Sequence, residues 1–334
     1  MAGGSGTQYY PTIRSQIIFL ADSIVAVIKR RQFLKTSTLL AGGSALFSGF
    51  SIAQEFKCEL NRLQGVQLFT VRDAMDEDPA GTLAGLADIG VKEVEVFGLT
   101  SSDNMFGNSL SEFRVLLNQY GIKTSCAHMD ATVLDVEGIS RSAHALGIET
   151  VVLPIGPDFI NVSDAGVRIQ GSQSLEDVRE LGDLMNRLGR GLADQGLNFA
   201  YHNHHVEFFD VQGQIPFDYL MAYTDPELVK IELDIGWLAL ANVNYLDYLD
   251  RYNTRVVSVH LKDFIGNRPD DMGDFLGAAA NLVSPGSGVI DFQGVLERMD
   301  AYGIGHGFVE IDMAPEPFEA ISSGVQHLEM LRPC

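Results

Sequence analysis

The sequence reads NFAYHNHH at residues 198–205, a stretch that joins a strand pattern to three closely spaced histidines. The residues from Leu197 to Tyr201 are apolar and aromatic, as in a buried strand. Alternation along a strand then places His202 and His204 on the same side, at the point where the strand ends. Two imidazoles on one side of a strand end are typical of a metal site, although hydrogen-bonded core histidines would give the same pattern.

The composition excludes one class of function and allows a large core. The chain has 334 residues, 46% of them hydrophobic, and a formal net charge of −21. A charge of this sign and size argues against a protein that binds nucleic acid through its phosphates. The three cysteines are widely spaced and form neither a zinc pattern nor an evident disulfide framework.

The N-terminal part resembles a twin-arginine export signal. Residues 29–35 read KRRQFLK and precede a run of small and apolar residues that ends with Ser51 and Ala53 at the −3 and −1 positions of a cleavage site. We expect residues 1–53 to be an extension with this signal, cleaved after Ala53, and residues 54–334 to form the folded domain. The chain would then be periplasmic or otherwise exported; an uncleaved membrane anchor is the alternative, although its Gly, Ser and Thr residues suit one poorly.

From residue 63 onward, short apolar strands alternate with helical patterns. The expected strands are 65–71, 93–97, 123–127, 150–154, 198–204, 229–234, 256–261 and 307–311. The expected helices are 79–89, 109–120, 133–146, 174–195, 217–223, 245–252, 292–302 and 317–331. This order predicts a single-domain α/β protein, a (β/α)8 TIM barrel, rather than an open doubly wound sheet. The longest irregular stretch, 264–290, would overhang the mouth of the barrel.

Charged and imidazole side chains follow the ends of six expected strands. Because active sites of (β/α)8 barrels lie where the strands finish, these residues should meet at one end. Buried charges are costly unless they are paired or bind a metal, so the pattern predicts a shared ligand. The residues are Glu95, His128, His202, His204, Glu232, Asp234, His260, Lys262, Glu310 and Asp312.

Several motifs resemble the sugar phosphate isomerase/epimerase family, the xylose isomerase-like TIM barrels, which include inosose dehydratases and endonuclease IV. The motifs are GVQLFTVRD (65–73), YHNH (201–204), ELDIGW (232–237), VHLKD (259–263), GSGVIDF (286–292) and FVE (308–310). The resemblance implies one divalent ion, most often Mn²⁺, held by Asp234, His260 and Glu310. His202 stands where many relatives have the fourth ligand, a glutamate, and the nearest carboxylate is Glu207. The donor set also suits Zn²⁺, Fe²⁺ or Co²⁺, with Mg²⁺ as a further candidate.

The resemblance implies a metal-dependent sugar or keto-sugar isomerase or epimerase that works through an enediolate-type intermediate. An inosose dehydratase-like lyase and a non-catalytic sugar-binding barrel are the alternatives, and the acidity disfavours a nuclease. We expect Glu310 to act as the base, His204 or Glu207 (or His202) as its partner, and Lys262 to stabilise negative charge.

Further residues are expected to contact the substrate, namely Glu95, His128, Asn203 and Trp237. Trp237, the only tryptophan, could form a stacking wall for a sugar ring or pack in the core. The expected partners are a small sugar, the export machinery during translocation and a second copy of the chain, but no nucleic acid.

Overall fold

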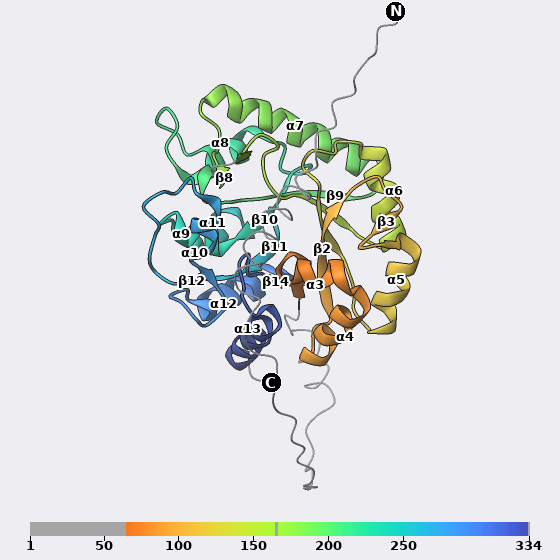
Figure 1. Cartoon of the computed structure of the whole chain (residues 1–334). Helices are drawn as coiled ribbons and strands as arrows, with labels where there is room; N and C mark the ends of the chain where they lie inside the picture. The colour runs from red at the N-terminus through yellow and green to blue at the C-terminus, as the bar shows by residue number, and fades with distance from the viewer. Residues whose placement is uncertain (1–64, 164–165, 333–334) are drawn as a thin grey trace, which may run out of the picture. The chain divides into compact units, whose positions relative to one another are not determined.

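Eight parallel strands close into a barrel, as the sequence predicted. The computed structural model describes residues 65–163 and 166–332. Around the barrel the strands follow the order β1, β14, β11, β10, β9, β6, β5, β2. Helices surround the strands (Figure 1). The expected export signal lies outside the described residues, and within them no helix is both long and apolar enough to cross a membrane.

Most barrel strands differ from the expected ranges by a few residues at their ends, whereas β11 has the expected bounds and β2 extends two residues further. The barrel strands are β1 (Gly65–Gln67), β2 (Glu93–Leu99), β5 (Cys126–Met129), β6 (Thr150–Leu153), β9 (Asn198–His202), β10 (Lys230–Asp234), β11 (Val256–Leu261) and β14 (His306–Val309). The expected first strand, 65–71, is wrong beyond Gln67. There the Gln67 side chain accepts a hydrogen bond from the N–H of Phe69, and the chain turns into the 3-10 helix η1 (Leu68–Val71). The third strand begins three residues later than expected, at Cys126.

The eight expected helices agree closely with α4 to α8, α10, α12 and α13 because their end signals are explicit in the sequence, whereas the short helices α3, α9 and α11 were not expected. The helices are α3 (Arg72–Glu77), α4 (Pro79–Ile89), α5 (Leu110–Gln119), α6 (Val136–Leu146), α7 (Leu175–Ala193), α8 (Pro216–Tyr223), α9 (Ile235–Leu240), α10 (Tyr245–Tyr252), α11 (Phe275–Ala279), α12 (Phe292–Tyr302) and α13 (Pro317–Leu331). Ser109 and Ser174 form capping boxes at the starts of α5 and α7. Gly147 ends α6 at a φ of 83°, a left-handed conformation that glycine adopts without strain.

The barrel interior is polar at the ends of its strands. In β10, Ile231 and Leu233 point to the surrounding helices, while Glu232 and Asp234 point inward, where they meet His260. All five side chains are fully buried. Strand alternation therefore gathers charged groups within the barrel, where apolar layers would ordinarily lie.

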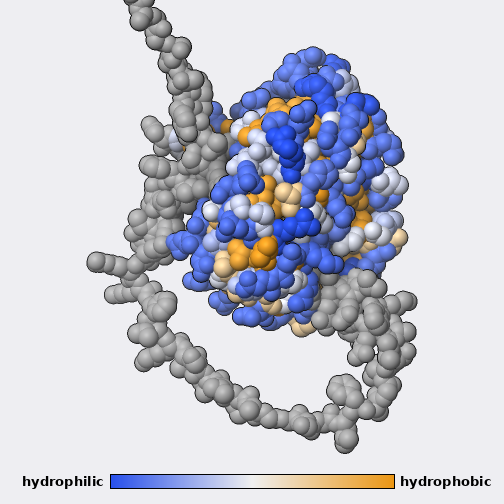
Figure 2. Space-filling model, turned by 90° about the vertical axis from the view of Figure 1, so that its right-hand side faces the viewer, coloured by the Kyte–Doolittle hydropathy of each residue, from blue (hydrophilic) through white to orange (hydrophobic). Residues whose placement is uncertain are grey.

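The stretch 264–290 is more ordered than its sequence predicted. It contains α11 and the second strand of the small antiparallel pair β12 (Asp263–Phe264) and β13 (Leu282–Val283). The buried Asp263 carboxylate organises this segment, since it accepts hydrogen bonds from the N–H groups of Phe264, Gly286, Gly288 and Ile290. On the face seen in Figure 2, the described surface is mostly hydrophilic with small scattered hydrophobic patches.

Candidate metal and catalytic centre

The inward side chains form two connected groups at the ends of the barrel strands. Each group combines imidazoles and carboxylates whose potential ligand atoms lie within 4.8 Å of one another. The first, here called the upper group, consists of His202, Asp234, His260 and Glu310. The second, the deep group, consists of His128, His202, Glu232 and His260. Two histidines belong to both groups, so the geometry of their rings decides how the groups are related.

The upper group contains the four residues expected to bind a metal. His202 Nε2 lies 3.5 Å from Asp234 Oδ2, and His260 Nδ1 lies 2.7 Å from Glu310 Oε2. Asp234 Oδ2 is buried and lies 2.9 Å from the Lys262 ammonium nitrogen. Burial lowers the pKa of His202 to about 3, so its ring is neutral at neutral pH and offers a lone pair. Two imidazoles and two carboxylates, all buried, fit a divalent transition-metal ion.

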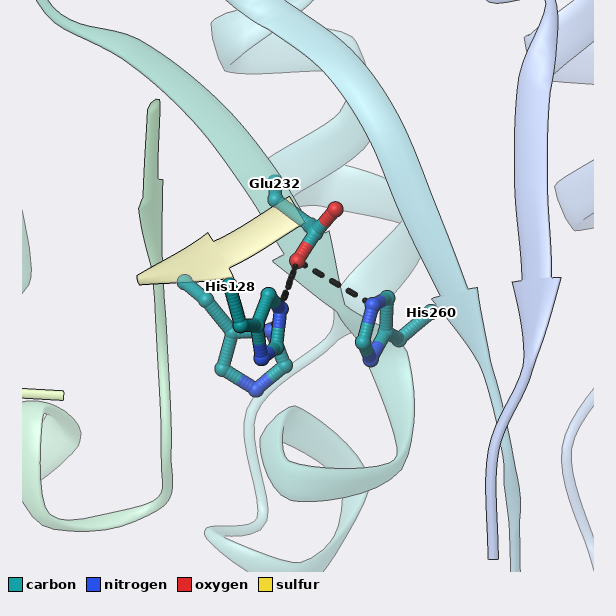
Figure 3. Close-up of side chains that lie close together, drawn as sticks. His128, Glu232 and His260 are labelled. Atoms are coloured by element: carbon teal, nitrogen blue, oxygen red, sulfur yellow. Dashed lines mark hydrogen bonds and ion pairs between the residues drawn. The ribbon is translucent and has the colours of Figure 1, made fainter. Parts of the chain in front are cut away.

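Glu232 stands at the centre of the deep group. Its Oε1 lies 2.6 Å from His128 Nε2 and 3.1 Å from His260 Nε2 (Figure 3). The same oxygen is 3.2 Å from His202 Nδ1, while Oε2 accepts a hydrogen bond from the Ser258 hydroxyl. Glu232 was recognised in the strand pattern but received no role. Glu232 points inward because it lies two residues before Asp234 in the same strand, and alternate residues of a strand face the same side.

Glu95 lies beside the deep group rather than at an open substrate surface. Its Oε2 is 2.6 Å from His260 Nε2 and accepts a hydrogen bond from Gln67 Nε2, whereas its Oε1 has no hydrogen-bond partner. Burial, reinforced by the neighbouring charge of Glu232, raises the pKa of Glu95 to about 7. The side chains of Glu95 and of Glu232 are fully buried, and that of His128 is 9% exposed.

Lys262 joins the upper group to a further carboxylate. Its Nζ lies 2.9 Å from Asp234 Oδ2, 2.6 Å from Glu310 Oε2 and 2.9 Å from Asp312 Oδ2. Burial alone would lower the pKa of Lys262, but the three carboxylates outweigh it and raise the pKa well above its ordinary value. The ammonium therefore remains charged. Only a residue without Cβ fits at Gly236, because a Cβ there would lie 2.3 Å from Lys262 Cγ.

Two expected substrate contacts have other functions in the structure. Both polar atoms of the Asn203 amide bond to the backbone of Asp234, and the residue is fully buried, so it supports the strand end rather than facing a sugar. Trp237 is fully buried, with its ring stacked near His205 and Phe275. The stacking-wall interpretation is therefore replaced by core packing, which the sequence also allowed.

His204 and Glu207 differ sharply in their surroundings. His204 lies just beyond the end of β9, with its ring 5.1 Å from those of His202 and Trp237 and its Nδ1 unpartnered. Glu207 instead accepts hydrogen bonds from the Tyr201 hydroxyl, at 2.6 Å, and from the His204 N–H, at 3.1 Å. Since Tyr201 points away from the barrel interior, Glu207 supports the end of β9 from behind. The expected acid–base role of Glu207 does not fit this position.

Three other residues received no role from the sequence. Gln67 and Ser258 hold Glu95 and Glu232, and Asp312 pairs with Lys262. Alternation placed Ser258 two residues before His260 on the inward face, and Asp312 two residues after Glu310. Because Gln67 and Ser258 are uncharged, the pattern of charged residues at the strand ends did not mark them as parts of the site.

Comparison with known proteins identifies the family. Residues 83–332 match the xylose isomerase-like TIM barrels. The chain belongs to this family. It is 33% identical over 195 residues to an inosose dehydratase of Geobacillus thermodenitrificans, a match that covers 52% of this chain and 65% of that relative. The chain thus spans less than two thirds of the length of this curated relative.

Solved structures with low sequence identity have the same barrel. A sugar phosphate isomerase/epimerase from Parabacteroides distasonis superposes with a TM-score of 0.64 at 20% identity, covering 80% of this chain and 94% of that one. The IOLI protein, solved with a bound zinc atom, superposes with a TM-score of 0.56 at 16% identity, covering 80% and 95%. At these identities the likeness establishes the fold alone.

Proposed function

We propose that this xylose isomerase-like barrel is a divalent-metal-dependent enzyme that removes the proton next to the carbonyl of a sugar or keto-sugar. The observation that supports it most is the upper group, in which His202, Asp234, His260 and Glu310 converge within the barrel. A bound ion would act there as a Lewis acid that polarises the substrate carbonyl. The remaining chemistry would come from side chains around this group.

Glu310 is the proposed base. Burial alone would raise the pKa of Glu310, but Lys262 and His260 outweigh it and hold the pKa well below its ordinary value. The carboxylate is therefore ionised and able to accept a proton. Lys262, 2.6 Å from Glu310, would stabilise the negative charge of the enediolate.

His204 is the proposed second acid–base group. Burial lowers its pKa well below the ordinary value, so the ring is neutral and can accept or donate a proton. The acid–base pair is thus a carboxylate and an imidazole.

Two outcomes can follow proton removal, and each has its own support. Isomerisation or epimerisation is our first candidate, in line with the name of the sugar phosphate isomerase/epimerase that shares the barrel. Dehydration is the second, and the 33% identity to an inosose dehydratase favours it. In a dehydration, Glu310 would take the proton beside the carbonyl, and the neutral His204 ring would relay this proton to the departing hydroxyl group, which leaves as water.

The identity of the metal is also a proposal. We favour Mn²⁺, and Zn²⁺ is the main alternative because the IOLI protein binds zinc. Imidazole and carboxylate donors accept both ions, so the side chains alone do not select between them.

Proton NMR in D2O tests the function. The metal-loaded protein is incubated with cyclic and open-chain keto-sugars, and exchange of the proton next to the carbonyl is followed together with the product. We expect exchange with at least one substrate, and a loss of about 10²-fold or more in Glu310→Gln. Formation of a new sugar isomer identifies an isomerase or epimerase, whereas loss of water identifies a dehydratase. Tight sugar binding without exchange would instead favour the sugar-binding barrel.

A further inference from the structure

We propose that the barrel has a second divalent-cation position in the deep group, formed by His128, Glu232 and His260 with Glu95 beside them. Their potential ligand atoms converge from four strands, β2, β5, β10 and β11. His128 Nε2 and His260 Nε2 lie 2.6 and 3.1 Å from Glu232 Oε1, and 3.4 and 2.6 Å from Glu95 Oε2. Ligands that surround one ion at about 2.1 Å lie about 3 Å apart, so small shifts would admit an ion.

The rings of His202 and His260, which belong to both groups, are oriented so that an upper and a deep ion could be bound at the same time. His202 has its Nε2 toward Asp234 and its Nδ1 toward Glu232. His260 has its Nε2 toward Glu232 and its Nδ1 toward Glu310. With both ions bound, His202, Asp234 and Glu310 would hold the upper ion and His260 would bind the deep one, so each ring can donate its other N–H to a carboxylate of the opposite group. Carboxylates of this kind commonly orient metal-binding histidines.

Charge balance gives an independent argument. Five buried carboxylates line this part of the barrel, namely Glu95, Glu232, Asp234, Glu310 and Asp312. Lys262 is the fixed cation among them, and it lies beside the upper three. Lys262 does not contact Glu95 or Glu232, so a divalent ion in the deep group would compensate carboxylate charge that this lysine does not reach. One ion in the upper group would leave Glu95 and Glu232 together, with imidazoles as their neighbours.

Glu95, beside the deep group, has one oxygen without a partner, and both carboxylates of this region have fixed supports. Glu95 Oε1 is buried without a hydrogen-bond partner, which is costly unless something else binds it. Gln67 holds Glu95 by its other oxygen, and Ser258 holds the far oxygen of Glu232. Both carboxylates therefore keep one oxygen directed at His260. Imidazoles with carboxylates suit Mn²⁺, Fe²⁺, Co²⁺ or Zn²⁺ better than Mg²⁺ or Ca²⁺.

The number of bound ions tests this second position, which goes beyond the proposed function and does not rest on it. Chelator-treated protein is equilibrated with excess Mn²⁺ or Zn²⁺, and bound metal per chain is measured by mass spectrometry. We expect two ions in the wild type and one in His128→Gln or Glu232→Gln. Asp234→Asn, the matched change in the upper group, should also keep one. One ion in the wild type, retained in His128→Gln, would overturn the proposal.

Electron paramagnetic resonance of the Mn²⁺-loaded wild type needs no substitution, so misfolding of a variant cannot confuse it. Two neighbouring ions should give a spin-coupled spectrum, and two uncoupled ions would place the second one elsewhere and refute the deep site. Failure of the upper site alone would look different: Asp234→Asn would keep the wild-type metal content while His128→Gln lost an ion.

Discussion

The Asn203 side-chain amide makes two hydrogen bonds with the backbone of Asp234. Its Oδ1 accepts from the Asp234 N–H at 3.0 Å, and its Nδ2 donates to the Asp234 carbonyl at 3.1 Å. The backbone pairing of β9 with β10 ends one residue earlier, at His202 and Glu232. Asn203 therefore extends the connection between the strands by one residue and fixes Asp234 beside His202.

Removing this amide should weaken both the fold and the upper group. In Asn203→Ala the buried N–H and carbonyl of Asp234 lose their partners, at a cost of about 2–4 kcal/mol in the free energy of unfolding. Metal affinity should fall about 10- to 100-fold, as for other supports of ligands. Chemical denaturation and metal titration measure the two effects. Asn118→Ala, on the exposed face of α5, should change neither, and unchanged metal affinity in Asn203→Ala would contradict the positioning role.

His202 and Glu207 should respond in opposite ways. His202→Ala removes a ring that faces Asp234, so the upper group should lose its ion. Glu207→Gln changes a side chain that contacts Tyr201 and the His204 backbone, so metal should be retained. Metal content of the two purified variants checks this. Retention in His202→Ala with loss in Glu207→Gln would reverse the assignment.

The buried Glu207 carboxyl should also make stability depend on pH. Burial raises its pKa from 4.5 to about 7, so the folded state holds this proton more tightly than the unfolded state does. Its contribution is fully present below pH 4.5 and is lost as the pH rises to about 7, by on the order of 3 kcal/mol. The Glu207→Gln variant has no carboxyl at this position and therefore lacks this pH-dependent contribution to stability. In chelator, its unfolding free energy relative to wild type should therefore rise between about pH 5 and pH 7.5. A constant difference would show that Glu207 does not titrate as described.

The order of strand and helix patterns predicted the barrel. Alternation along the strands, with the rule that active sites of (β/α)8 barrels lie where the strands finish, then predicted which polar residues meet, because both arguments need only the local sequence pattern. Alternation also placed Glu232 beside Asp234, but the sequence could not show that three imidazoles surround Glu232, since they come from strands far apart in the chain. The same limit applies to Asn203 and Trp237. Each lies next to apparent site residues in sequence, yet the structure uses one as a clamp and the other as packing.

Export by the twin-arginine route stays a prediction, since its residues lie outside those that the structure describes. Replacing Arg30 and Arg31 with lysine keeps the charge but removes the arginine pair that this route requires. We expect the double variant to accumulate inside the cell with its signal uncleaved, as cell fractionation and immunoblotting would show. A variant of Arg14→Lys should be exported normally. Normal export of the double variant would remove the main support for the proposed localisation.

The metal content of Asp234→Asn tests the central claim most directly. This substitution preserves the size of a fully buried side chain but removes a charged ligand atom from the upper group. Wild type, Asp234→Asn and the exposed control Asp103→Asn are equilibrated with Mn²⁺, checked for folding by circular dichroism and analysed for metal per chain. We predict that folded Asp234→Asn binds one ion fewer than the wild type and the control. Equal metal content in all three proteins would contradict a metal centre at His202, Asp234, His260 and Glu310.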